Sequence, residues 1–502
     1  MFTEKDQKQA LELLSSIQDC NADNALKNSK ELLNDVFGAR FTEGIEQNGV
    51  LRYNSLSGSD ESVKYWGLLY EGATTGGPYE NFSLVIIPYT AEQGNSDHLL
   101  LSFGIGTGGI TDDASWLVTP WVQRSIHTLL RLVNDNKWNR NNTKTFVKDD
   151  LLEENTPIPD DIIAYTGDYS DYSTLWKKYG NYLPSICVID ANENGAQAFL
   201  AHLLLYGNFR DWKILKHYQD ILNSKLFPSL FSEWRKYPKI EDLKQYTLER
   251  KYIILQGPPG TGKTYLAEEI ASSLKSDNKI EGYDSIQFHP SINYEDFVVG
   301  LKPDTTNEKQ LIFKKQIGPL VNAIRKAHDS DKGYLLIIDE INRADIAKVL
   351  GEAINLFEIG VEREITLRNA EKYKMPNNLY VIGTMNTADR SIAILDYAVR
   401  RRFAFIDIWP SQEILEYLIE DDEVIEIAKN YFGKLQTIFF KYANDIDLHL
   451  QPGHSYFYAN NKAQLERKLK NEVSTLLNEY LNEGRLPLAK NQLKALIEDF
   501  SF

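Results

Sequence analysis

The spacing of apolar residues in the first half of the chain predicts a mixture of helices and short strands. Apolar residues that recur every three or four positions are typical of amphipathic helices, whereas short apolar runs bounded by Gly, Pro and Asn are typical of strands. A polar, Asn-rich stretch at residues 134–150 is interpreted as a surface loop or linker. The predicted helices cover residues 4–17, 24–37, 121–136, 196–207 and 211–227, and the predicted strands cover residues 82–90, 98–106 and 184–191.

From about residue 240 the pattern changes, because apolar strands and helical segments begin to alternate. Such alternation is typical of a parallel sheet covered by helices. The chain after residue 410 is mainly helical, which predicts a small α-helical domain at the carboxyl end. The alternating strands are expected at residues 251–256, 285–290, 333–341 and 379–386, with helices at 264–274, 318–328 and 347–358 between them.

Composition narrows the class of protein. The chain has 502 residues, of which 42% are hydrophobic and 25% charged, as in globular proteins with several domains. No apolar run approaches the length of a membrane helix, the first residues are charged rather than apolar, and Cys20 and Cys187 lie far apart, so we expect a cytoplasmic protein without a membrane partner. A net charge of −16 argues against non-specific coating of nucleic acid, although a local basic groove remains compatible with it.

The segment GPPGTGKT follows the predicted strand at residues 251–256 and precedes a predicted helix. It fits the pattern of a phosphate-binding P-loop, in which glycines let successive backbone N–H groups point at phosphate oxygens and a helix amino terminus adds a positive dipole. Lys263 is expected to reach the β- and γ-phosphates, and the Thr264 hydroxyl to ligate Mg²⁺. The residues expected to bind the nucleotide are therefore Gly257, Pro258, Pro259, Gly260, Thr261, Gly262, Lys263 and Thr264.

Two acidic residues, Asp339 and Glu340, end the apolar run YLLIIDE. Ligand groups in a doubly wound sheet lie at the carboxyl ends of its strands. We therefore expect Asp339 to hold Mg²⁺ through water and Glu340 to orient and polarise the attacking water. A solvated strand end is the alternative interpretation, and the P-loop earlier in the chain argues against it.

Asn386 ends the strand LYVIGTMN, and three arginines, Arg400, Arg401 and Arg402, follow a short helical pattern. An asparagine beside the γ-phosphate can hydrogen-bond both phosphate and attacking water without adding charge. Phosphoryl transfer builds negative charge on the γ oxygens, which an arginine from a neighbouring subunit can stabilise. We expect the arginines to serve the next subunit, which implies a ring. A solvated basic helix end is the alternative for any single arginine.

Five motifs occur together in a recognisable order: GPPGTGKT, FHPSINYEDFVVGLKP, IIDEINRADIAKVLGEAINLFE, GTMNTADRSIAILDYAVRRRF and GHSYFY. This part of the chain, roughly residues 240–460, resembles the motor subunit of McrBC modification-dependent restriction systems. The resemblance implies an AAA+ fold, hydrolysis of GTP rather than ATP, assembly into a hexameric ring, and translocation of DNA with a separate McrC-type subunit that carries a PD-(D/E)xK nuclease domain.

The resemblance also implies roles for individual residues. The segment Asn386–Asp389 corresponds to the family's signature after the third strand, so Asp389 joins the nucleotide-binding residues. Arg401 and Arg402 correspond to the trans-acting finger and its neighbour, and Arg343 is expected near a subunit interface and the nucleotide. The segment GHSYF lies at or near the second sensor of the helical lid, whereas His454 alone would be read as an ordinary surface or capping histidine.

No family resemblance extends to residues 1–235, where McrB-like proteins carry a DNA-reading module. An aromatic pocket there could stack a flipped base, but an ordinary aromatic core is the stronger interpretation. The segment GIGTGG at residues 104–109 lacks the helix that a dinucleotide loop requires and is interpreted as a flexible loop. The aromatic residues concerned are Tyr65, Trp66, Tyr70, Tyr79, Trp116, Trp121 and Trp138.

The sequence thus predicts an α/β AAA+ P-loop NTPase with a helical lid, preceded by a mixed α+β domain. With the resemblance, the expected function is that of a GTP-hydrolysing, ring-forming motor of an McrBC-like antiphage restriction system. This motor would recognise DNA, possibly modified, through the first half of the chain and drive a separate nuclease subunit, and it would have no nuclease activity of its own. The alternatives are a MoxR-like ATP-dependent protein-remodelling ATPase, and a defence sensor whose first half binds a phage protein or small molecule. The expected regions are a target-recognition domain at 1–140, a mainly helical connecting region at 141–240, the NTPase core at 241–410 and the lid at 411–502.

Overall fold

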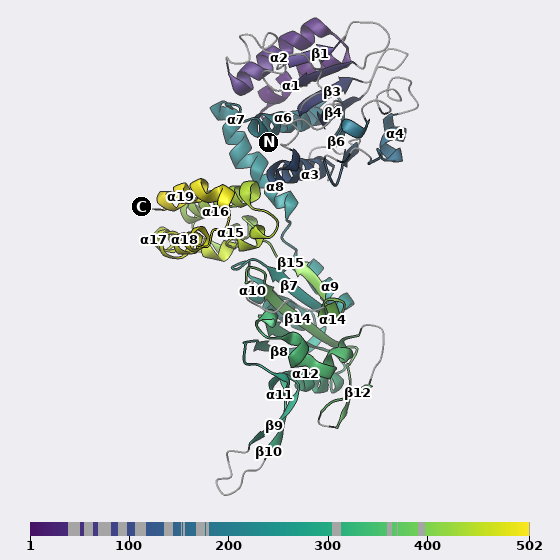
Figure 1. Cartoon of the computed structure of the whole chain (residues 1–502), viewed down its shortest axis with the longest axis vertical. Coiled ribbons are helices and arrows are strands. Elements are labelled where there is room, and N and C mark those ends of the chain that lie inside the picture. The colour runs from purple at the N-terminus through teal and green to yellow at the C-terminus, as the bar shows by residue number, and fades with distance from the viewer. Residues whose placement is uncertain are drawn as a thin grey trace. The chain divides into compact units, whose positions relative to one another are not determined.

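A computed structural model divides the chain into two compact units, Met1–Arg235 with Phe440–Tyr442, and Lys236–Phe439 with Ala443–Phe502 (Figure 1). The structure describes residues 1–38, 51–54, 64–68, 82–88, 98–105, 117–134, 144–151, 153, 156–166, 176, 180–303, 313–358, 364–368, 370–389 and 397–500. Within these residues, none of the helices combines the length and apolar character that crossing a membrane requires.

The first unit contains an antiparallel six-stranded sheet with the order β1-β2-β3-β4-β6-β5. The strands β3, β4 and β6 are buried along their whole length, because α1 and α6 pack on the sheet. The strands are β1 (Leu51–Asn54), β2 (Tyr65–Leu68), β3 (Ser83–Pro88), β4 (Leu99–Gly104), β5 (Lys144–Val147) and β6 (Ser185–Ile189), and the helices are α1 (Glu4–Gln18), α2 (Ala22–Phe37), α3 (Pro120–Asn134), α4 (Asp160–Thr166), α6 (Glu193–Phe209), α7 (Lys216–Ile221) and α8 (Phe227–Trp234).

The sheet changes the expected division of the first half. Strands β5 and β6 pair with each other, and β6 pairs with β4, so residues 141–235 complete the sheet that residues 51–104 begin. The boundary expected at residue 140 therefore falls inside one unit. The predicted helix at 211–227 is also divided, because α7 and α8 are separated by a π-helical turn at Leu222–Leu226.

The aromatic residues of the first unit form a core in the part that the structure describes. Tyr65, Trp66 and Trp121 are all buried. Trp66 packs edge-on against Phe199 of α6, and its indole N–H donates to the Ser29 hydroxyl (2.8 Å). These three residues follow the core interpretation, whereas Tyr70, Tyr79, Trp116, Trp138 and most of the segment at 104–109 lie outside the described residues.

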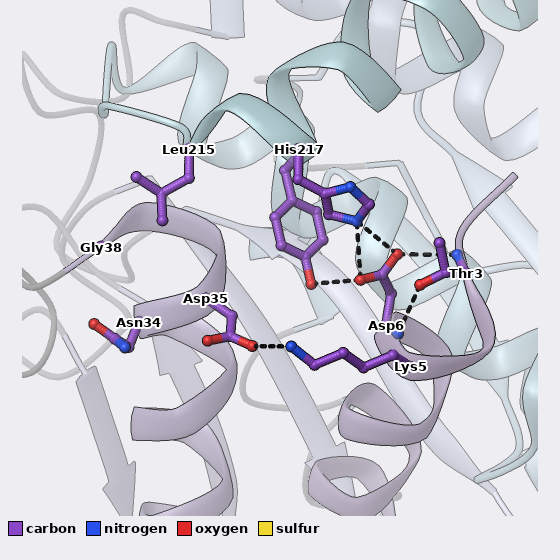
Figure 2. A pocket seen from close by; sticks show the side chains of 9 residues that line it. Thr3, Lys5, Asp6, Asn34, Asp35, Gly38, Leu215 and His217 are labelled. Atoms are coloured by element: carbon purple, nitrogen blue, oxygen red, sulfur yellow. Dashed lines mark hydrogen bonds and ion pairs between the residues drawn. The ribbon is translucent and has the colours of Figure 1, made fainter.

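A pocket in the first unit is lined by side chains that pair with one another (Figure 2). Asp6 of α1 accepts hydrogen bonds from the Tyr218 hydroxyl (3.0 Å) and His217 Nε2 (3.0 Å) of α7, and Lys5 pairs with Asp35 of α2 (3.1 Å). Burial alone would raise the pKa of Asp6, but hydrogen bonds from Thr3, His217 and Tyr218 hold it below its ordinary value. The ionised carboxylate therefore stabilises the folded state above the unfolded pKa, and this contribution is lost as the pH falls.

The second unit contains a parallel five-stranded sheet with the order β15-β7-β14-β11-β8, which confirms the expected fold class. Alternate residues of its strands enter two separate cores: Ile253, Leu255, Leu335 and Ile337 face one, and their neighbours along β7 and β11 face the other. The sheet elements are β7 (Tyr252–Gly257), β8 (Ile280–Gln287), β11 (Gly333–Asp339), β14 (Leu379–Asn386) and β15 (Ala404–Asp407).

Helices cover both faces of this sheet, as a parallel sheet requires. Leu266 and Ile270 of α10 belong to the first core, and Leu320 and Ile324 of α12 belong to the second. The remaining helices and small strands of this part are α9 (Ile240–Arg250), α10 (Lys263–Ser276), α11 (Tyr294–Phe297), β9 (Val299–Pro303), β10 (Phe313–Ile317), α12 (Pro319–His328), α13 (Ile346–Leu350), β12 (Glu364–Thr366), β13 (Lys372–Lys374) and α14 (Tyr397–Arg400).

The predicted helical carboxyl-terminal part is also present, and it belongs to the second unit. Its longest helix buries Phe432, Leu435 and Phe439, and Phe432 packs edge-on against Phe457. The helices are α15 (Glu413–Leu418), α16 (Asp422–Tyr442), α17 (Lys462–Lys468), α18 (Ser474–Asn482) and α19 (Lys490–Asp499).

Candidate nucleotide site

The P-loop connects β7 to α10, as the sequence predicts. Gly260 and Gly262 both have φ of +75°, a conformation that residues with a Cβ rarely adopt. A Cβ on Gly260 would also lie 2.6 Å from the Ser455 hydroxyl and 2.8 Å from the Tyr456 ring. These glycines therefore permit both the turn of the loop and the close approach of a second segment, residues 453–456.

Lys263 begins α10 and is buried within the loop. Its ammonium donates to the carbonyls of Gly257 (3.0 Å) and Pro258 (2.6 Å). Burial lowers the pKa of Lys263 to about 8, although the carboxylates of Glu340, Asp339 and Asp389 oppose this change. The loop thus contains one buried cation, surrounded by backbone, in the position where a P-loop lysine contacts phosphate.

Three side chains meet at the carboxyl ends of β7, β14 and β11. The Thr264 hydroxyl donates to Asp339 Oδ1 (2.7 Å), and the Thr384 hydroxyl of β14 donates to the same oxygen (2.6 Å). The strand order explains this meeting, because β14 lies between β7 and β11 in the sheet. Asp339 is therefore fixed next to the P-loop threonine, as expected for a pair that binds a metal ion.

Glu340 follows β11 in a left-handed backbone conformation, with φ of 54° and ψ of 45°. Its carboxylate Oε2 lies 3.4 Å from Arg343 Nε, and Arg343 Nη2 lies 3.8 Å from Asp389 Oδ2. The predicted residues Glu340, Arg343 and Asp389 are thus brought together. The Glu340 side chain is about one-quarter exposed, and the residue lies at the end of the sheet that carries the P-loop.

Asn386 is the last residue of β14 and lies opposite Gly257 in the register of β14 and β7. Its side-chain Oδ1 accepts the backbone N–H of Ala388 (3.1 Å), and its carbonyl accepts a hydrogen bond from the Asn342 amide (3.0 Å). The next residue, Thr387, donates its N–H to the Gly257 carbonyl (3.0 Å). The end of β14 is therefore attached directly to the first residue of the P-loop.

Thr264 and Asp339 fit a Mg²⁺ ion in their chemistry. A hydroxyl and a carboxylate oxygen are hard oxygen ligands, and Mg²⁺ in phosphoryl-transfer sites keeps several waters and substrate phosphates as its other ligands. Groups of three or more His, Cys, Asp or Glu side chains placed to hold a metal are absent from the described residues. Thr264 and Asp339 are therefore the residues that could hold this ion together with the phosphates of a nucleotide.

The three consecutive arginines have different environments. Arg402 has only 3% of its side chain exposed, and it donates to Asn355 Oδ1 (3.0 Å), Glu358 Oε1 (2.5 Å) and the Ala398 carbonyl (2.9 Å). Arg400 lies over the Phe405 ring. Arg401 is 65% exposed and pairs with Glu358 (2.9 Å). Arg401 is therefore the better placed of the two predicted finger residues to reach outside its own subunit.

The segment GHSYF contacts the P-loop through its backbone. The N–H of Gly453 donates to the Pro259 carbonyl (2.8 Å), and the N–H of Ser455 donates to the Gly260 carbonyl (3.0 Å). His454 is buried, so burial, with a smaller contribution from Lys263, lowers its pKa to about 4. The imidazole is thus neutral near pH 7, unlike the surface histidine that the sequence alone would suggest.

Comparison with known proteins identifies the kind of domain that carries these residues. Residues 252–403 match the family model of the AAA domain of the dynein-related subfamily. Residues of this chain are 36% identical over 253 residues to the type IV methyl-directed restriction enzyme EcoKMcrB subunit of Escherichia coli K12, an alignment that covers 48% of this chain and 52% of that protein. The chain carries an McrB-like AAA domain.

A second relative is the BsuMI component YdiS of Bacillus subtilis, a type II restriction enzyme component, which is 28% identical over 220 residues. That alignment covers 36% of this chain and 63% of the relative. The chain therefore spans about half the length of the first relative and less than two thirds of the second. The similarity therefore identifies the AAA domain of this chain.

Two contacts of the AAA domain were missed in the sequence analysis. Thr384 lies inside a strand, where threonine is common for reasons of packing, so its residue type alone does not distinguish it. Tyr237 donates its hydroxyl hydrogen to the Thr261 carbonyl (3.3 Å) and packs edge-on against His454, although it precedes the predicted strand at 251–256 with which the motifs begin. The position of Thr384 two residues before Asn386 is the one signal that could have marked it.

Nucleotide affinity of the AAA domain should fall as the pH rises above about 8. The protonated Lys263 binds phosphate, and burial has lowered its pKa, so half of the charge is lost at about pH 8 rather than near pH 10.5. The Kd should then rise by up to about tenfold per pH unit, because binding requires one proton. Titration of a fluorescent nucleotide from pH 7 to 9.5 measures this.

The matched variant for this prediction is Lys263→Arg, whose guanidinium stays protonated throughout the range. Its affinity, even if weaker than that of the natural chain, should show no loss above pH 8. A natural chain whose Kd stays constant up to pH 9.5 would contradict a buried, titrating Lys263.

Proposed function

We propose that this chain is the nucleotide-hydrolysing motor of an McrBC-like restriction system, with GTP as its substrate. The observation that carries the proposal is the contact of Thr264 with Asp339 beside the P-loop, with the next carboxylate, Glu340, close enough to act electrostatically on Lys263. A hydroxyl, a metal-binding carboxylate and a water-orienting carboxylate are the parts that nucleotide hydrolysis needs. The similarity to a subunit of a methyl-directed restriction enzyme supports the choice of system. The choice of GTP follows from the resemblance of the motifs to McrBC motor subunits.

In this proposal each residue has a separate task. The P-loop N–H groups and Lys263 bind the phosphates, and Thr264 and Asp339 hold Mg²⁺, which neutralises charge on the phosphate oxygens when bound. Glu340 accepts a hydrogen bond from the attacking water and polarises it. Asn386 orients that water and the γ-phosphate without adding charge. Arg343 and Asp389 limit the positions that the Glu340 carboxylate can take.

The site is completed in this proposal by a neighbouring subunit of a ring, for which a hexamer is the expected form. Arg401 lies one helical turn after Tyr397, to whose carbonyl its N–H donates (3.1 Å), and the Tyr397 side chain is 89% exposed. Residues one turn apart share a helix face. An exposed aromatic ring next to an exposed arginine supports contact with another chain, while Arg402 supports this face from inside through Glu358 and Asn355.

The remaining parts of the proposal rest on the similarity alone. The first unit would recognise DNA, modified or not, and a separate McrC-like subunit with a PD-(D/E)xK domain would cut it. The chain would then act by coupling nucleotide hydrolysis in its second unit to DNA engaged by the first. Guanine preference also rests on the relatives, because base selection depends on contacts to the base edge that the P-loop does not make.

Steady-state hydrolysis of GTP and ATP in parallel, with the molar mass measured under each condition, tests the proposal. We expect GTP turnover, assembly that depends on nucleotide, and retention of methylated or unmethylated duplex DNA by the full chain. Turnover of ATP only would favour a protein-remodelling ATPase or an ATP-using restriction motor. If the chain hydrolyses GTP but retains no duplex, the motor function would stand, and the proposal that the first unit recognises DNA would be wrong.

A further inference from the structure

We infer that Thr384 is a positioning residue, which aligns the metal-binding and the water-orienting carboxylates through one hydroxyl group; this inference rests on the proposed function. Thr384 is buried in β14. Its hydroxyl donates to Asp339 Oδ1 (2.6 Å) and accepts the backbone N–H of Glu340 (3.0 Å). One proton and one lone pair are used, so both bonds form at the same time.

The bond to the Glu340 N–H matters because of the backbone at this residue. Glu340 has φ of 54° and ψ of 45°, a region that residues with a Cβ populate sparsely and that persists only where the surroundings impose it. The Thr384 hydroxyl holds the peptide group between Asp339 and Glu340, because it accepts the N–H of Glu340. The direction in which the Glu340 side chain leaves the sheet therefore depends on the Thr384 hydroxyl.

Two further contacts seat the same turn on β14. The 3₁₀ turn at Ile341–Arg343 follows Glu340, and a Cβ on Gly383 would come within 3.0 Å of Ile341 Cδ1, so glycine permits this close packing. The Asn342 amide donates to the Asn386 carbonyl (3.0 Å). The turn after the catalytic carboxylate is thus attached to β14 before, at and after Thr384, and the Thr384 hydroxyl is the attachment that reaches both carboxylate residues.

The geometry separates this role from nucleotide binding. None of the hydrogen bonds described for the Lys263 ammonium reaches the Thr384 hydroxyl, whereas Asp339 Oδ1 accepts hydrogen bonds from both Thr264 and Thr384. Loss of the Thr384 hydroxyl should therefore leave the phosphate-binding loop intact. It should allow the Asp339 carboxylate and the Glu340 peptide to rotate away from the arrangement that hydrolysis requires.

The test is a comparison of Thr384→Val, which keeps the shape of the side chain, with Thr384→Ser, which keeps the hydroxyl. In the full-length chain we expect Thr384→Val to lower kcat by about 10- to 100-fold, as losses of supporting hydrogen bonds around metal sites do, with KM changed less than about threefold. Thr384→Ser should stay within about threefold of the natural kcat. Thr247→Val, a buried threonine whose hydroxyl bonds within α9, controls for the general effect of the substitution.

Binding of a fluorescent nucleotide and the thermal unfolding midpoint are measured on the same preparations. A Thr384→Val chain that is folded, binds nucleotide and keeps its natural kcat would overturn the inference, and so would an equal loss in Thr384→Ser. If Thr384→Val fails to fold, the test becomes a comparison of Thr384→Ser with Thr384→Ala. Thr384→Ser should keep turnover and Thr384→Ala should lose it. Loss of turnover in both variants would again overturn the inference. The proposed function fails separately, when the natural chain itself hydrolyses neither GTP nor ATP.

Discussion

Glu340→Gln should bind nucleotide with nearly natural affinity and lose about 100-fold or more of kcat, the range that removal of a general base typically costs. Glutamine has almost the same shape as glutamate, but it cannot accept a proton or polarise water as a carboxylate does. Asp339, Thr264 and Lys263 remain, so binding of phosphate and Mg²⁺ is retained. Single-turnover hydrolysis and nucleotide titration on one preparation measure the two effects.

The same substitution at Glu268 provides the control, because this glutamate is exposed on α10, the helix that begins at the P-loop. Glu268→Gln removes one charge from the same helix without touching the site, and its turnover should equal that of the natural chain. Unchanged turnover in Glu340→Gln would show that another group activates the water. Loss of binding together with turnover would instead mean that Glu340 supports the structure of the loop.

The central strands of the sheet were predictable from the sequence because both of their faces are buried. β7, β11 and β14 read as unbroken apolar runs, and the polar residues that follow them mark the edge where ligands bind. β8 was placed too late, at 285–290 instead of Ile280–Gln287, because it is an edge strand whose outer residues face solvent. An edge strand carries too few apolar residues to be seen as a run.

Other elements depended on backbone conformation that apolar spacing does not report. The helix predicted at 347–358 ends at Leu350, since Gly351 has φ of +51° and the chain continues as a 3₁₀ helix to Phe357. The contacts of residues 453–456 with the P-loop are made by backbone N–H groups. Neither feature changes the pattern of apolar and polar side chains. The motif GHSYF could therefore be recognised in the sequence, but its backbone contact with the P-loop could not be predicted.

The arginine run shows the same limit for side chains. Arg400, Arg401 and Arg402 are chemically identical and consecutive, so sequence spacing alone cannot separate their roles. Packing separates them, because Arg402 points into a cluster with Asn355 and Glu358 while Arg401 stays exposed. A role in a neighbouring site requires an accessible guanidinium, which makes Arg401 the residue to test and Arg402 a support of its surroundings.

Arg401→Ala should assemble but lose nearly all turnover by itself, and should regain activity when it is mixed with Lys263→Ala, which is inactive because it lacks the phosphate-binding lysine. Each Arg401→Ala subunit keeps an intact P-loop, and each Lys263→Ala subunit keeps the arginine that a neighbour needs. In a ring formed at random from equal amounts of the two variants, with head-to-tail contacts, about one quarter of the interfaces join these two intact halves. Turnover of the mixture should therefore reach about a quarter of that of the natural chain.

Arg400→Ala is the matched control, because it removes the same charge from the neighbouring residue, whose guanidinium lies over the Phe405 ring of its own chain, and it should keep natural turnover. Co-purification of two differently tagged variants shows that mixed rings have formed. If mixed rings form and remain inactive, Arg401 does not act in a neighbouring site. If Arg401→Ala alone keeps natural turnover, the run of arginines belongs to the fold, and the Arg401–Glu358 pair is only a surface ion pair that holds α14 in place.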